Sequence, residues 1–239
     1  MKTTKLNSGS PPGDNYSELE RMNKLVLSYL TVRKIIGWLG LSLALILVLG
    51  SIIIGACHHI QPSLSNYYHT NMRDVFVGYV CSLSIFLISY KGYDLTDRIV
   101  SVLAGIFGLT LALFPTNYVV PLPECNIVCN QQTHGFIGIM HLVSAGLFLL
   151  SLAYFSYFLF TKGEVTPTPQ KIIRNKIYKA AGIIMAACVW LLIILFLLPD
   201  SASATLYTHN AVFWLETIGI TAFGISWLIK GEFIFKDAA

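Results

Sequence analysis

The chain has 239 residues, of which 55% are hydrophobic and only 12% are charged, with a net charge of +4 and a mean hydropathy of +0.66. The charged fraction is about half that of a typical soluble domain, and a globule of this length has no interior large enough for so much apolar surface. The composition therefore excludes a disordered chain, a nucleic-acid-binding protein and an ordinary soluble enzyme. It predicts an all-α, polytopic membrane protein.

Six apolar stretches predict six transmembrane helices, since about 20 helical residues cross the hydrocarbon core. In chain order they are 35–57, 75–90, 99–114, 135–160, 180–198 and 211–229. The second and third stretches are short, and the alternative is a buried helical hairpin that does not cross. The charged turn between them, residues 91–98, favours two crossings that reach water.

The basic residues predict the orientation of the bundle, because Lys and Arg stay on the cytoplasmic side. All of them except Arg73 fall in the N-terminal tail, the second and fourth connections, the edge of the fifth span and the C-terminus. We therefore expect a six-transmembrane-helix bundle with both termini cytoplasmic, in the bacterial inner (plasma) membrane. Residues 1–33 form a partly disordered cytoplasmic tail, 34–231 the transmembrane domain, and 232–239 a short cytoplasmic tail. Residues 16–34 either continue the first span as a helix, which we favour, or lie on the membrane as an amphipathic helix.

Histidine placement points to the outer half of the bundle. His134 and His141 are seven residues apart, as are His209 and Glu216, so in each pair the second residue lies about 10.5 Å deeper. Both helices run inward, which places His141 and Glu216 at the same depth. An ionised carboxylate there is costly unless it is paired. We therefore predict an outward-facing polar cavity with His141, Ser144 and Glu216 at its floor. The alternative is an interhelical hydrogen bond without chemistry.

The first outer loop, residues 66–74, is dense in hydrogen-bonding side chains. Arg73 is the only basic residue predicted on the outer side, and a guanidinium suits a carboxylate or phosphate. With Tyr68 and His69 it forms the predicted ligand-binding set. Asp74 either caps the second helix or faces the cavity.

Five cysteines are present, and Cys57, Cys125 and Cys129 fall on the predicted outer side. In an oxidising compartment a disulfide between Cys125 and Cys129 would staple the outer loop over the cavity.

Four stretches, residues 63–78, 112–116, 141–145 and 213–231, resemble a family of bacterial multi-pass membrane proteins of unknown function. The chain is also remotely similar to the alkaline ceramidase and adiponectin-receptor-like superfamily. That likeness implies a membrane-embedded, zinc-dependent amide hydrolase with three histidines, an aspartate and a serine. The matching residues are His134, His141, His209, Asp74 and Ser144. The H-x3-H pair that this superfamily has on its last helix is absent, since His209 is followed by Phe213.

Three functions remain open. The first is metal-dependent hydrolysis of a lipid, with zinc held by His134, His209 and either His59 or Asp74, and with Glu216 or His141 moving the proton. The second is a small transporter or proton-linked carrier. The third is a non-catalytic scaffold or sensor that binds a lipid or small molecule. We expect a membrane lipid as the partner and no nucleic acid. The sequence sets neither the substrate nor the oligomeric state.

Overall fold

The computed structural model describes residues 12–90, 92, 94–117, 135–162 and 167–235. These residues are helical and contain no β-strand. The elements are α1 (Pro12–Gly55), the 3-10 helix η1 (Ser65–His69), α2 (Arg73–Ser89), α3 (Leu95–Leu113), α4 (Gly135–Tyr154), the π-helix η2 (Phe155–Leu159), α5 (Pro169–Leu197), α6 (Asp200–Thr208) and α7 (Ala211–Lys230). The all-α prediction is confirmed for the described residues.

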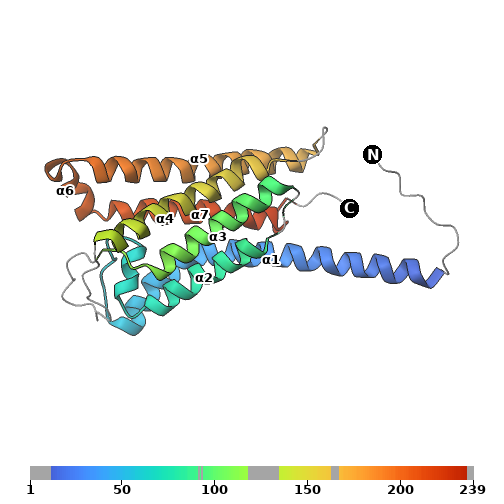
Figure 1. The fold of residues 1–239 in the computed structure, drawn as a ribbon, viewed down its shortest axis with the longest axis horizontal. Coiled ribbons are helices and arrows are strands. Elements are labelled where there is room, and N and C mark those ends of the chain that lie inside the picture. The colour runs from blue at the N-terminus through green and yellow to red at the C-terminus, as the bar shows by residue number, and fades with distance from the viewer. Residues whose placement is uncertain (1–11, 91, 93, 118–134, 163–166, 236–239) are drawn as a thin grey trace.

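The long helices form a closed ring in which each contacts its neighbours, in the order α1, α2, α3, α4, α5, α7 and back to α1. They lie roughly along one direction (Figure 1). Helices α1 and α7 pack closely against each other at two glycines, Gly37 and Gly224. A Cβ on Gly224 would lie 2.7 Å from the Leu41 nitrogen, and a Cβ on Gly37 would lie 2.8 Å from the Leu228 nitrogen. Small residues at such crossings let two membrane helices pack backbone to backbone.

Five segments are long and apolar enough to cross a membrane: Tyr29–Gly55, Leu95–Leu113, Gly135–Leu159, Pro169–Leu197 and Ala211–Lys230. This is the architecture of an integral, multi-pass membrane protein. Helix α2 has 17 residues and is only about 26 Å long. It nevertheless occupies a full place in the ring between α1 and α3.

Helix α1 runs without interruption from Pro12 into the first span, as the favoured helical extension predicts. Its first turns project beyond the bundle (Figure 1). Helix α5 begins at Pro169, eleven residues before the predicted fifth span, because Thr168 caps its first turn by accepting a hydrogen bond from the Lys171 amide. Neither η1 nor α6 was predicted.

The bundle has two chemically different ends. We call the end with η1, residues 114–117 and α6 the η1 end. The opposite end, with Arg33, Lys162, Lys171 and Lys230, is the basic end. The two ends lie at opposite ends of the helix ring, and α1 projects beyond the basic end (Figure 1).

Candidate functional site

The carboxylate of Glu216 binds the loop that leads into η1. The Leu64 amide donates a hydrogen bond to Glu216 Oε2 over 2.6 Å, and the Ser65 amide also hydrogen-bonds this carboxylate. One turn earlier on α7, the Phe213 amide donates to the Pro62 carbonyl over 3.0 Å. Glu216 is half-buried and lines the apolar space between α4, α5 and α7. Its side chain therefore fastens the η1 loop to α7.

Two imidazoles bind the carbonyl end of α3. His141 Nδ1 lies 2.7 Å from the Phe114 carbonyl oxygen, and His69 Nε2 lies 3.0 Å from the Thr116 carbonyl oxygen. A carbonyl oxygen only accepts, so these ring nitrogens carry the hydrogen. The last carbonyls of a helix have no partner within it, and Pro115 prevents α3 from continuing. The histidines supply the missing donors, while His141 Nε2 stays buried without a hydrogen-bond partner.

The predicted pair between His141 and Glu216 is not formed. Each side chain binds a different backbone segment, and no ion pair joins the two residues. The reason is the direction in which α4 presents its faces. His141 and Ser144 are buried on the face toward α3, whereas Gly146 belongs to the face that meets the cavity beside Glu216. Sequence spacing sets depth along a helix, but it does not set which neighbour a face meets.

A cavity of about 430 Å³ lies between α4, α5 and α7, with Glu216 in its wall. Its other lining residues are apolar, and they include Leu142, Leu149, Ile193 and Phe196. This space therefore differs from the predicted polar cavity with a histidine, a serine and an acid at its floor. Glu216 is its single ionisable lining residue. The other two floor residues lie elsewhere on α4.

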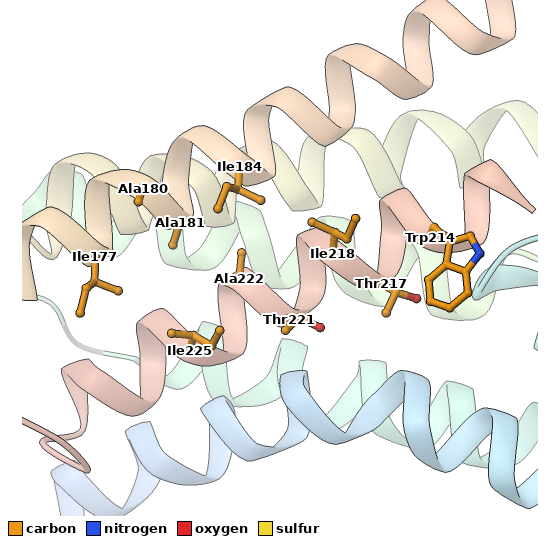
Figure 2. Close-up of a pocket in the computed structure, with 10 residues that line it drawn as sticks. All are labelled: Ile177, Ala180, Ala181, Ile184, Trp214, Thr217, Ile218, Thr221, Ala222 and Ile225. Carbon is orange, nitrogen blue, oxygen red and sulfur yellow. The ribbon is translucent and has the colours of Figure 1, made fainter.

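A second cleft of about 370 Å³ separates α5 from α7 (Figure 2). Figure 2 shows Ala181 and Ile184 of α5 pointing toward Ala222 and Ile218 of α7. Trp214, Thr217 and Thr221 of α7 also line this cleft. The Thr217 hydroxyl is buried without a hydrogen-bond partner. These three residues share one stripe of α7, and Glu216 lies about 200° around the helix from Trp214. The two clefts therefore border different faces of the same helix.

The predicted ligand-binding residues Arg73, Tyr68 and His69 do lie together. Arg73 Nη2 donates to the Tyr68 hydroxyl over 3.1 Å, and its guanidinium carbon is 4.8 Å from the centre of the Tyr68 ring. The Tyr68 and His69 rings meet edge to face at 5.6 Å. Both rings are buried, and beside them burial raises the pKa of Tyr67 to about 12. The loop is thus buried at the η1 end of the bundle, and Arg73 at its edge is half-buried.

The predicted zinc ligands do not assemble within the described part of the chain. There, no group of three His, Cys, Asp or Glu side chains is placed to hold a metal ion. His59 is exposed just after α1, Asp74 is exposed in the first turn of α2, and His209 is exposed where α6 ends. His134 lies outside the described residues. The sequence analysis did not predict helix α6, which lies between α5 and His209. The position expected for His209 therefore differs from the one observed.

Cys57 forms a disulfide, whereas Cys81 and Cys188 are free thiols. The partner of Cys57 therefore lies outside the described residues, as do Cys125 and Cys129. Only three of the five cysteines remain for bonds once the two free thiols are set aside. The predicted bond between Cys125 and Cys129 stays a prediction that competes with the bond of Cys57 for the same thiols.

The basic end holds a polar cluster that the sequence analysis missed. Arg33 is only 6% exposed, and it donates to the Lys230 carbonyl over 3.3 Å and to the Tyr90 hydroxyl over 3.3 Å. Its guanidinium stacks 4.2 Å from the centre of the Tyr29 ring. Arg33 and Lys230 stand at the ends of apolar runs, where a charged residue is normally solvated. The aromatic residues at the same helix ends could have indicated in the sequence that these cations are buried.

An exposed ion pair borders this cluster. Lys162 Nζ lies 2.7 Å from Asp94 and 2.7 Å from the buried Asp97. Hydrogen bonds from Lys162 and from the Asp97 amide lower the pKa of Asp94, and the two aspartates raise the pKa of Lys162. The pair ties the start of α3 to the segment that follows η2.

Comparison of the chain with protein-family models, curated proteins and solved structures finds no match. The resemblances to a bacterial membrane-protein family and to the ceramidase-like superfamily therefore stay predictions.

Proposed function

We propose that this chain is a six-span membrane protein that binds the hydrocarbon chain of a membrane lipid in the cavity between α4, α5 and α7. The observation that carries the proposal is an apolar groove of about 430 Å³ that opens at the bundle surface and has Glu216 as its one ionisable lining residue. Ligand cavities have volumes of about 300–1,000 Å³. A lipid chain that lies in this groove gains dispersion contacts with its apolar wall.

The topology that goes with this proposal has α2 as the sixth span, the basic end in the cytoplasm and the η1 end outside. Lysine and arginine concentrate at the basic end, which supports the cytoplasmic assignment. Cys57 follows α1 at the η1 end and is disulfide-bonded, which supports an oxidising compartment there. The cavity then opens at the level of the outer leaflet.

Glu216 has a structural role in this proposal. Its oxygens accept hydrogen bonds from the η1 loop, so the carboxylate closes the outer end of the cavity wall. The proposal does not include hydrolysis, since the zinc hypothesis depends on His134, which lies outside the described residues. Proton-linked transport likewise has no specific observation in its favour.

A photoactivatable lipid with a diazirine on its acyl chain tests the proposal directly. We expect it to label α4 and α5 peptides in the wild type. A Cβ added at Gly146 meets nothing within 4 Å, so Gly146→Phe places a ring in the cavity without a backbone clash. This variant should lower the labelling at the less exposed lining residues Leu149 and Val189, while the lipid-facing residues of α4 and α5 stay labelled.

Gly78→Phe is the matched control. Gly78 is also a helical glycine whose Cβ would meet nothing within 4 Å, but it lies exposed on α2, away from the cavity. Labelling of α4 and α5 should stay at the wild-type level in this variant. Equal labelling in Gly146→Phe and wild type would rule out the cavity as the lipid site.

A further inference from the structure

Glu216 is the one ionisable residue in the wall of the groove between α4, α5 and α7, and no cation pairs with it in the described part of the chain. The two groups that bind it, the Leu64 and Ser65 amides, are neutral hydrogen-bond donors. They stabilise a carboxylate but do not cancel its charge. A carboxylate at membrane depth is costly unless a cation pairs with it. The groove therefore presents a negative charge that a ligand can neutralise.

The same carboxylate keeps room for a further donor. A carboxylate has about four acceptor positions on its two oxygens, and the Leu64 and Ser65 amides occupy two of them. Open space lies on the α4 side of the groove, because a Cβ added to the lining residue Gly146 would meet nothing within 4 Å. A ligand that enters the groove therefore finds both space and an acceptor for its N–H groups.

The apolar part of the wall suits one extended alkyl chain. Its α4 residues run from Leu142 to Leu150, a rise of about 12 Å, so the groove follows the helix axes. Glu216 precedes Gly219 by three residues on α7, and a Cβ on Gly219 would lie 2.9 Å from Leu149. Helices α4 and α7 therefore close on each other about one turn deeper than Glu216. An amphiphile fits with its head at Glu216 and its chain between α4 and α5.

We propose that the ligand of this groove is a single-chain lipophilic amine whose ammonium group pairs with Glu216. The inference rests on the proposed function and deepens it by naming the headgroup of the ligand. An ammonium supplies both the opposite charge and N–H donors. A fatty acid would instead place a second carboxylate beside the first. A quaternary ammonium has no N–H and is recognised by cages of aromatic rings, whereas Phe196 is the single aromatic side chain among the described lining residues.

Three photoactivatable probes with the same diazirine-bearing alkyl chain test the headgroup. They end in a primary amine, a hydroxyl or a carboxylate, and each labels the full chain in phosphatidylcholine nanodiscs at a subsaturating concentration. Labelling at Leu149 and Val189 is divided by labelling at the exposed Trp190, which corrects for the amount of each probe in the bilayer. We expect this ratio to be about tenfold higher for the amine than for the other two probes, the effect of one charge-assisted hydrogen bond.

The outcomes separate this inference from the proposed function. If the alcohol or the acid labels as well as the amine, and Gly146→Phe lowers the labelling by all three probes, the amine is overturned and the lipid site stands. If Gly146→Phe lowers the labelling by none of the probes, the groove is overturned as a lipid site, and the amine with it. A higher ratio for the amine that Gly146→Phe abolishes supports both.

A charge-matched pair of variants identifies the partner of the ammonium. Glu216→Gln keeps an acceptor oxygen but removes the charge, so the preference for the amine over the alcohol should disappear while labelling by the alcohol stays. Glu232→Gln changes the net charge equally at a position after α7 that does not line the groove, and it should keep the preference. An unchanged preference in Glu216→Gln, or its loss in both variants, would contradict Glu216 as the partner. The wild-type comparison of the three probes decides the proposal even if Glu216→Gln does not fold.

Discussion

At the η1 end, imidazoles bind the carbonyl oxygens of Phe114 and Thr116, whereas at the basic end Lys and Arg side chains bind those of Phe160 and Lys230. Both ends face the same problem, since the last carbonyls of every helix lack partners within that helix. An imidazole solves it by donating one ring N–H. A buried ammonium or guanidinium solves it and brings a full positive charge with it.

The difference teaches how to interpret polar residues in this bundle. The histidines and the acid at the η1 end looked like a reaction site, yet their partners are backbone groups of α3 and of the η1 loop. The charged residues at the basic end looked like solvated flanks, yet three of them are less than a tenth exposed. At both ends, polar side chains that look functional in the sequence are partnered by backbone groups.

The largest expected effect comes from removing a buried cation at the basic end. Arg33→Met leaves the Lys230 carbonyl and the Tyr90 hydroxyl without their guanidinium donor, so we expect a loss of about 2–5 kcal/mol in the free energy of unfolding. Reversible unfolding in sodium dodecyl sulfate measures it. Lys34→Met removes the same charge one residue later and should cost under about 1 kcal/mol. Similar losses in both variants would mean that Arg33 acts only through its charge.

The next effect sharpens the assignment at the η1 end. Glu216→Ala strips the acceptor from the Leu64 amide and should cost about 1–3 kcal/mol. Glu216→Gln keeps one acceptor oxygen and should cost less than half as much, with unchanged protease resistance of the η1 loop. A glutamine variant as unstable as the alanine variant would show that the charge, rather than the acceptor oxygen, holds the loop.

The smallest effect concerns pH at the exposed edge of the basic end. The pKa of Asp94 is lowered in the folded state, so its contribution to stability is present above its unfolded pKa and is lost as pH falls through the folded pKa. Stability should therefore decline in the acid range below about pH 4. Lys162→Met removes the interaction and should flatten this decline. An identical acid profile in the variant would exclude the ion pair as its cause.

The fold was predictable to the extent that apolar length and charge determine it. The six apolar runs correspond to the six ring helices, with the fourth run continuing into η2. The η1 loop was not predictable, because its burial depends on hydrogen bonds from Leu64 to Glu216 and from Phe213 to Pro62, between segments far apart in sequence.

The site was predictable only in part. The cluster of Arg73, Tyr68 and His69 follows from closeness in sequence, and the depth of His141 and Glu216 follows from helical rise. Which helix each of these two side chains faces depends on how far each helix rotates about its own axis. Packing at contacts such as that of Gly224 with α1 sets this rotation. The spacing of residues in the sequence does not predict it.

The central claim is that His141 and Glu216 serve separate backbone segments. A double-mutant cycle with His141→Phe and Glu216→Gln tests it most directly, with the free energy of unfolding as the readout. Residues that share no partner combine additively, so we predict a coupling energy within about 0.5 kcal/mol of zero. A coupling above about 1 kcal/mol would show that the two side chains interact, and it would contradict the account given for the η1 end.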